Sequence, residues 1–304
     1  MSSVLKKKYL FLILILVLAP VARELSFGLL AHDHAPFGTV HDLIHTTAEM
    51  GFMLLTSLFI VVIDFRLFRE KIINKQLNHL VEEKTQEIVC TQKASIEALA
   101  SLAEYRDTDT GQHLERIQNY VHLIVRGLLE KSPYKKHLEN IIGFIDDVTL
   151  ASILHDIGKV AIPDHILFKP GKLNDEEFEI IKQHAIAGGK ILEAANKKIK
   201  KNTNMISYLD YAQDIANYHH EKWDGTGYPE GLFQEETPIV ARIVALCDVY
   251  DAVTTDRVYK KAWSHEKARD VILKNRGQHF DPVITDVFER LEGTFNRTRI
   301  MYQK

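Results

Sequence analysis

The chain has 304 residues and a formal net charge of −3, with 15 histidines and two cysteines. A nearly balanced charge excludes a protein that binds nucleic acid polymers through bulk positive charge. The cysteines, Cys90 and Cys247, form no CxxC pair, which argues against a cysteine-based zinc knuckle.

Residues 1–68 predict a membrane hairpin. Lysines at 6–8 precede an apolar run, 9–22, which is shorter than the about 20 residues of a full span but can extend to residue 30. A cleaved signal peptide is the alternative for this run. A second run, 50–63, can extend back to residue 43 and ends next to Arg66 and Arg69. Basic residues outside both runs place the two ends in the cytoplasm, whereas a soluble helical hairpin is the other interpretation.

The loop between the two runs is rich in histidine. It is expected on the outer side of the membrane, as a metal, haem or proton sensor or as a polar cap on the hairpin. Its histidines are His32, His34, His41 and His45.

Residues 69–102 predict one long helix without Pro or Gly. Apolar or small residues recur at spacings of three and four, from Ile73 and Leu77 to Leu102, with a break at Lys84. This pattern favours a coiled-coil seam, and hence a homodimer, over a plain solvated linker helix.

Residues 103–304 predict an all-α domain of about seven helices. Strand-like alternation is absent, and clear turn signals such as Phe280-Asp281-Pro282 separate the helical patterns. One long structured loop is expected over 222–238.

Five clusters in this domain carry metal-ligand residue types. Their imidazoles and carboxylates, without thiolate, suit iron, manganese, zinc or nickel. They are more numerous than one tetrahedral ion needs and fit two ions about 3.5–4 Å apart that grip a phosphoryl group, with Asp156 as the bridge. If the stretch is helical, Lys159 shares a face with His155. The clusters are Asp109 with His113, His155 with Asp156 and Lys159, His184, His219 with His220, and Asp248.

The chain over 94–290 resembles the HD-GYP domain, a branch of the HD metal-dependent phosphohydrolases. The resemblance rests on YRDTDTGQHLERI, LHDIGKVAIPDHILFKPGKLNDEEFEIIKQH, YHHEKWDGTGYPEGL and ARIVALCDVYDAVTTDRVYKKAWS. It implies a bundle of the HD type that hydrolyses the bacterial second messenger cyclic di-GMP to linear pGpG, and often on to GMP. It also implies possible partners with diguanylate-cyclase (GGDEF) domains.

The resemblance assigns the site residues. It implies two divalent ions, iron or manganese, and leaves a third open because Asp109 stands where members with a third metal carry Glu. Lys159 takes the family's active-site lysine position. The implied metal ligands are His113, His155, Asp156, His184, His219, His220 and Asp248.

Substrate contacts are expected from cations near Asp248 and from the GYP turn. Tyr228 offers a ring face for guanine, and Trp223 is expected to pack the loop. Two alternatives to cyclic di-GMP hydrolysis stay open: turnover of a mixed cyclic GMP-AMP dinucleotide, and binding of a nucleotide or partner without turnover. The expected contact residues are Arg242, Arg257, Lys260, Gly227, Tyr228 and Pro229.

Overall fold

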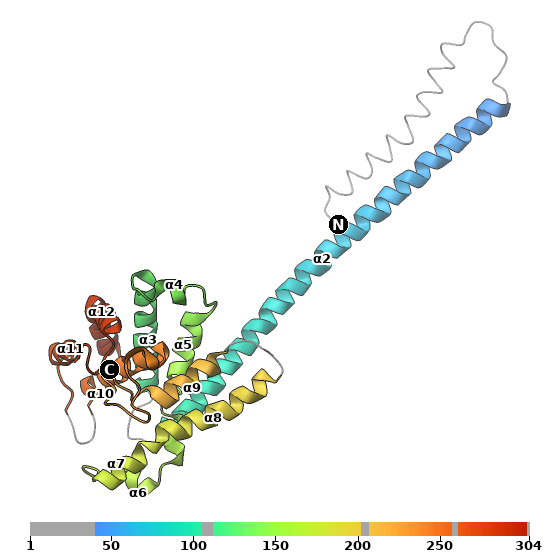
Figure 1. Cartoon of the computed structure of the whole chain (residues 1–304). Helices are drawn as coiled ribbons and strands as arrows, with labels where there is room; N and C mark the ends of the chain where they lie inside the picture. The colour runs from blue at the N-terminus through green and yellow to red at the C-terminus, as the bar shows by residue number, and fades with distance from the viewer. Residues whose placement is uncertain (1–39, 105–111, 202–206, 257–260, 303–304) are drawn as a thin grey trace. The chain divides into compact units, whose positions relative to one another are not determined.

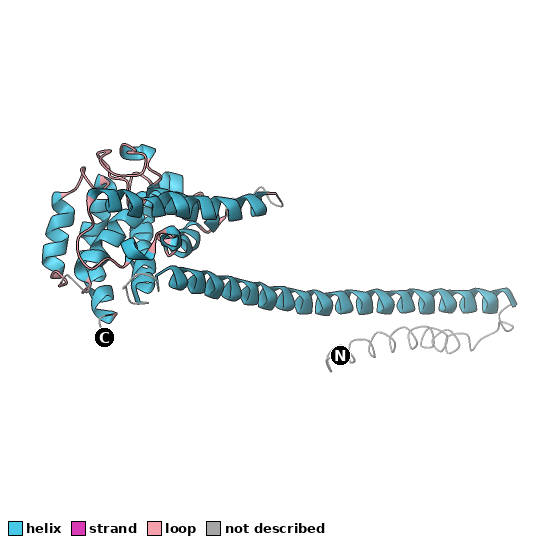
Figure 2. Ribbon diagram, turned by 90° about the horizontal axis from the view of Figure 1, so that it is seen from below, coloured by secondary structure: helices cyan, strands magenta, loops and turns pink. Residues whose placement is uncertain are grey.

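The computed structural model describes residues 40–104, 112–201, 207–256 and 261–302. Within these ranges every regular element is a helix, and strand pairing is limited to two isolated bridges. The all-α prediction is confirmed (Figures 1 and 2). The elements are α2 (Val40–Glu104), α3 (Gln112–Glu130), α4 (Lys135–Leu138), α5 (Phe144–Ser152), η1 (Ile157–Ala161), α6 (Asp164–Leu167), α7 (Asp175–Ile181), α8 (Gln183–Lys200), α9 (Tyr208–Tyr218), η2 (Gln234–Glu236), α10 (Ile239–Thr254), α11 (His265–Lys274) and α12 (Pro282–Met301).

Helix α2 is unbroken through the second predicted span and the predicted linker helix. It contains no proline, and Gly51 is its single glycine. Large apolar side chains between Phe52 and Phe65 are exposed. Among the described residues, α2 is the one helix long and apolar enough to cross a membrane. The first apolar run, 9–30, lies outside the described residues.

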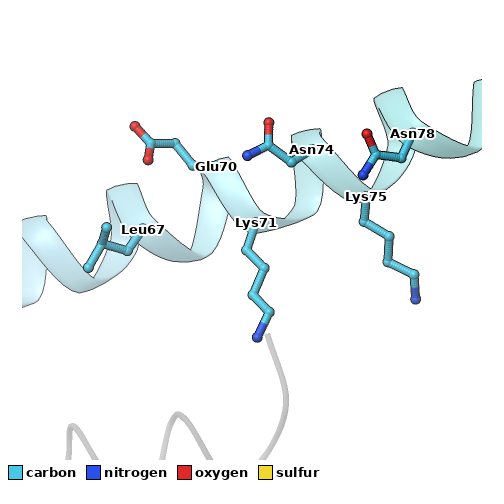
Figure 3. Close-up of a pocket in the computed structure, with 6 residues that line it drawn as sticks. All are labelled: Leu67, Glu70, Lys71, Asn74, Lys75 and Asn78. Carbon is cyan, nitrogen blue, oxygen red and sulfur yellow. The ribbon is translucent and has the colours of Figure 1, made fainter. Parts of the chain in front are cut away.

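Polar and basic side chains follow the apolar part of α2. Figure 3 shows Lys71 and Lys75 projecting on one side of the helix and Glu70 and Asn74 on the other. All residues that line this shallow hollow belong to α2. The hollow is therefore open helix surface, and it brings together no cluster of catalytic groups.

The chain divides into two compact units, 1–88 and 89–304. The last turns of α2 belong to the second unit, because Ile96, Ala100 and Ala103 are buried in its core or against it. The residues of the predicted seam lie on another face. Ile73, Leu77, Leu80, Ile88 and Leu102 are 46%, 53%, 51%, 66% and 63% exposed.

The second unit is built around α3, α5, α9, α10 and α12. Helix α3 is strongly amphipathic and buries an apolar stripe with helical spacing, Ile117, Tyr120, Val121, Ile124 and Leu128. The Tyr120 ring stacks on Phe295 of α12, with ring centroids 4.8 Å apart, and meets Tyr250 of α10 edge to face at 5.2 Å. These contacts fix α10 and α3 beside each other, which is needed for the site below.

Local capping explains several helix starts. Asp281 accepts hydrogen bonds from the N–H groups of Val283 and Ile284 at the start of α12, and Pro282 fills the first position. Asn174 and Glu177 form a capping box at α7. The long loop expected over 222–238 holds only η2 and one bridge, between Asp224 and Phe233.

Candidate metal centre

His155 and Asp156 lie in a turn between α5 and η1, not on a helix. The expectation that Lys159 reaches the site by sharing a helical face with His155 is therefore wrong. The 3-10 helix η1 nevertheless returns the Lys159 side chain to the turn, where its Nζ lies 2.7 Å from Asp156 Oδ2. The contact between Lys159 and Asp156 therefore results from the tight turn of the 3-10 helix and not from α-helical periodicity.

Gly158 lets this turn press against α8. A Cβ at Gly158 would lie 1.9 Å from the carbonyl oxygen of His184 and 2.4 Å from the backbone nitrogen of Gly188. Only glycine fits such an approach. The close packing brings Asp156 beside the His184 ring.

The other predicted ligands come from four helices and one loop start. His113 is the second residue of α3, and His184 is the second residue of α8. His219 caps the C-terminus of α9, and His220 follows it directly. Asp248 lies on α10, a helix that also contacts α3 and α9.

These side chains converge on Asp156. Asp156 Oδ1 lies 3.3 Å from His184 Nε2 and 3.8 Å from His219 Nε2, while Asp156 Oδ2 lies 3.2 Å from His155 Nε2. Asp248 Oδ1 lies 3.9 Å from Nε2 of both His155 and His113. The two carboxylates thus stand between two sets of imidazoles.

Four of the imidazoles are oriented by hydrogen bonds at Nδ1. His155, His184 and His219 donate to the backbone carbonyls of Ser152, Ile181 and Ile215, at 2.9, 2.6 and 3.0 Å. His113 Nδ1 lies 2.7 Å from Asp251 Oδ2. Because each Nδ1 carries the proton, each Nε2 presents its lone pair to the centre when the ring is neutral.

The arrangement fits divalent metal ions. Among the described residues, Nε2 of His155 and His219 and Oδ1 of Asp156 are buried without a hydrogen-bond partner, which is costly unless a cation takes that place. His184 Nε2 and His220 Nε2 are 3.2 Å apart. Two groups have all their ligand atoms within 4.8 Å of one another: Asp156, His184, His219, His220 in one, and Glu104, His113, His155 in the other.

Burial and neighbouring charge set the protonation of these residues. Burial acts to raise the pKa of Asp156, but Lys159 and His155 outweigh it and hold this pKa well below the ordinary value. Burial lowers the pKa of His219 to about 4. Burial also lowers the pKa of His155, yet Asp156 and Asp248 reverse the effect and bring it to about 9. An ionised carboxylate among imidazoles is the electrostatic setting a cation requires.

The loop after His220 is fixed to the centre by backbone packing. A Cβ at Gly227 would lie 2.4 Å from the nitrogen of Lys222 and 2.6 Å from the carbonyl oxygen of His220. Glu221 is buried, and its carboxylate accepts hydrogen bonds from three consecutive backbone N–H groups, those of Glu230, Gly231 and Leu232, at 2.7 to 3.1 Å.

Tyr228 stacks on one of the predicted ligands. Its ring centroid lies 4.6 Å from that of His220, with 27° between the planes. Lys182 Nζ lies 5.6 Å from the centroid of the Tyr228 ring. The peptide bond between Tyr228 and Pro229 is cis. The GYP turn therefore forms a wall of the metal centre.

Arg242 is not brought to this cluster by any contact among the described residues. Its guanidinium pairs with Asp281, lies 3.1 Å from the Tyr134 hydroxyl and covers the Trp223 ring at 5.6 Å. That contact agrees with the packing role expected for Trp223. Substrate contact by Arg242 stays a prediction. Three other predicted site residues lie outside the described residues: Asp109, Arg257 and Lys260.

Three functional candidates were missed from the sequence. Asp251 holds His113 and is itself held by Arg116, through Nε at 2.6 Å and Nη2 at 2.8 Å. Asp251 follows Asp248 by one helical turn in the string DVYD, and this spacing could have pointed to it. Glu221 has its backbone partners nine to eleven residues later, and Glu104 sits outside every motif, so no spacing pointed to either.

Comparisons with known proteins agree with this geometry. The pattern of the HD-domain family matches residues 70–284. A "Probable cyclic di-GMP phosphodiesterase" of Vibrio cholerae is 46% identical over 71% of this chain and 48% of that protein. A "Cyclic di-GMP phosphodiesterase" of the same organism is 42% identical over 73% of this chain and 44% of that protein.

A third relative carries another substrate in its name. The "3'3'-cGAMP-specific phosphodiesterase 2" of Vibrio cholerae is 37% identical over 65% of this chain and 34% of that protein. The chain spans about half the length of the first two of these curated relatives.

Proposed function

The chain belongs to the HD-domain family, and from that premise we propose that it hydrolyses cyclic di-GMP. Water is added across one phosphodiester bond to give linear pGpG, and a second hydrolysis gives two GMP. The observation that carries the proposal is the set of imidazoles whose Nε2 atoms converge on Asp156 while Nδ1 is held elsewhere.

The centre is proposed to hold two divalent ions, iron or manganese. His113, His155 and Asp248 would hold one, and His184, His219 and His220 the other, with Asp156 shared. Such ions supply an activated water and stabilise charge on phosphoryl oxygens. Asp109 is proposed as a candidate ligand of a third ion.

Lys159 is proposed to bind a phosphoryl oxygen of the substrate. Its side chain is 14% exposed and its ammonium lies beside Asp156, so it presents a cation at the edge of the centre. Fixed charge at this position stabilises the transition state without reorganisation. Tyr228 is proposed to flank a base, with Gly227 and Pro229 shaping the turn, and Arg242, Arg257 and Lys260 to contact the phosphates.

The test is a turnover assay after anaerobic purification in iron-replete or manganese-replete medium. Wild-type protein should convert cyclic di-GMP to pGpG or GMP, and the H155A/D156A double variant should lose both turnover and metal. Full turnover by the double variant would refute the assignment. Metal-loaded wild-type protein that binds but does not hydrolyse would instead indicate a binding module.

A second candidate substrate is 3'3'-cyclic GMP-AMP. The relative of that specificity supports it, at 37% identity. Side-by-side initial rates on the two dinucleotides separate the candidates. A preference for cyclic GMP-AMP would change the assigned substrate and leave the proposed metal centre as it is.

We propose that the whole chain is organised as a membrane-anchored receptor. Residues 1–68 would form the two-span hairpin in the bacterial inner membrane, 69–102 the linker, and 103–304 the cytoplasmic phosphodiesterase. His32 and His34, with His41 and His45 in the first turns of α2, would act as a metal, haem or proton sensor or as a polar cap on the hairpin. Proteins with GGDEF domains are proposed partners. The exposed apolar part of α2 supports the membrane contact.

A homodimer is proposed through the exposed seam of α2. The L77E/L80E variant would place two charges in the seam and should be monomeric in detergent by light scattering. His79 and Gln86 lie on the opposite side of the helix by spacing, so H79E/Q86E is the matched control and should stay dimeric. Equal masses for both variants would contradict the seam.

A further inference from the structure

Glu104, where the described part of α2 ends, is a buried acid whose charged neighbours among the described residues include Lys159, His113 and His155. The residue is 4% exposed, and neither carboxylate oxygen has a hydrogen-bond partner there. An unpaired buried carboxylate is one of the most costly groups a protein can contain. A cation at this carboxylate would offset that cost.

Two imidazoles lie close to the Glu104 carboxylate. The carboxylate of Glu104 and one ring nitrogen each of His113 and His155 lie within 4.8 Å of one another. Nδ1 of both rings is already engaged, by Asp251 and by the carbonyl of Ser152. The remaining Nε2 atoms and a carboxylate form a donor set suited to a first-row divalent ion.

We propose that Glu104 is a ligand of the ion held by His113 and His155. The inference rests on the proposed metal centre, but not on which cyclic dinucleotide is hydrolysed. It makes the last described residue of α2 part of the centre.

The experiment counts metal in full-length protein in detergent. E104Q keeps the size of the side chain and removes its charge, whereas E97Q makes the same change two turns earlier, where Glu97 is 44% exposed and paired with Lys93. After dialysis against a weak chelator, E104Q should lose about one metal equivalent per chain, and E97Q should match wild type. Competition titration with Mn²⁺ should show at least about tenfold weaker binding at one site.

Thermal unfolding provides a second readout that a merely structural acid would not give. Without metal, E104Q should be more stable than wild type because the unpaired charge is gone. With saturating Mn²⁺ the order should reverse, since wild type gains more from the ion. E97Q should shift neither midpoint.

Unchanged metal content and affinity in E104Q would overturn the inference. Loss of one metal equivalent from D109N, with none lost from E104Q, would overturn it as well. The two proposals fail separately. If H155A/D156A keeps all its metal, the proposed centre is wrong. If that variant loses metal while E104Q does not, only the role of Glu104 is wrong.

Discussion

Gly158 lies so close to His184 that a Cβ added to Gly158 would be 1.9 Å from the His184 carbonyl oxygen. Both contacting atoms of α8, this oxygen and the Gly188 nitrogen, are backbone, so neither can rotate away. The G158A variant should therefore push the turn with Asp156 away from α8. We expect a loss of about 2–4 kcal/mol in the free energy of unfolding, measured by urea denaturation.

Gly293 offers the matched control for that change. It lies inside α12, and a Cβ there would meet nothing nearer than Arg297 Nη1 at 3.8 Å. G293A should stabilise the protein by about 0.5–1 kcal/mol because alanine is the better helix former. Equal effects of the two substitutions would contradict the packing argument.

Asp251 should control metal affinity without touching the metal. D251N keeps the shape of the side chain but removes the charge that orients His113 and pairs with Arg116. We expect about 10–100-fold weaker metal binding, by competition titration. D270N is the control, since the side chain of Asp270 is 66% exposed. Unaltered affinity in D251N would show that His113 needs no such support.

Lys159 should act on turnover more than on metal. K159M preserves the length of the side chain and removes the ammonium beside Asp156. We expect kcat to fall by about 10²–10³-fold, with the metal content retained. K190M, at an exposed position of α8, should leave the rate unchanged. Loss of metal from K159M would instead assign Lys159 to the integrity of the centre.

Asp214 should make stability depend on pH. Burial and the neighbouring Asp210 raise the pKa of Asp214 from 3.8 to about 6. The folded state thus holds this proton more tightly than the unfolded state, so its contribution to stability falls as pH rises from about 4 to about 6. D214N should match wild type near pH 4 and exceed it at pH 7.5 by on the order of 1 kcal/mol, allowing for solvent screening. A lower stability of D214N at pH 7.5 would contradict this sign.

Removal of metal should destabilise the domain. The unpaired Nε2 of His155 and His219 and Oδ1 of Asp156 lose their expected partner in a chelator. Mn²⁺ at 100 times its Kd should restore about 3 kcal/mol, measured as a rise in Tm. H155A/D156A should not respond to either treatment, and a response of that variant equal to wild type would contradict the assignment of the ligands.

The sequence predicted the all-α class and the residues that meet around Asp156, because the motif strings are specific. It did not predict how they meet. His155 and Lys159 were expected on one helical face, but a turn and a 3-10 helix bring Lys159 back. The distinction depends on the contact of Gly158 with α8, which joins segments about 26 residues apart, and local periodicity cannot report such contacts.

Charge near a motif does not report which tertiary partner a cation has. Arg242 is a cation six residues before Asp248, yet Asp281, far along the chain, takes its guanidinium. Glu104 had no motif to mark it, because it lies between the predicted linker, 69–102, and the motif that begins at Tyr105. The burial of Ile96, Ala100 and Ala103 shows that this part of α2 packs into the domain.

Glu221 has a consequence for access to the centre. Its carboxylate accepts three backbone hydrogen bonds from residues 230–232, directly after the two adjacent histidines. Bonds of this charge-assisted kind contribute about 1.5–3 kcal/mol each, so swinging the loop outward would sacrifice all three at once. Residues 230–232 are therefore a fixed part of the structure beside the metal centre.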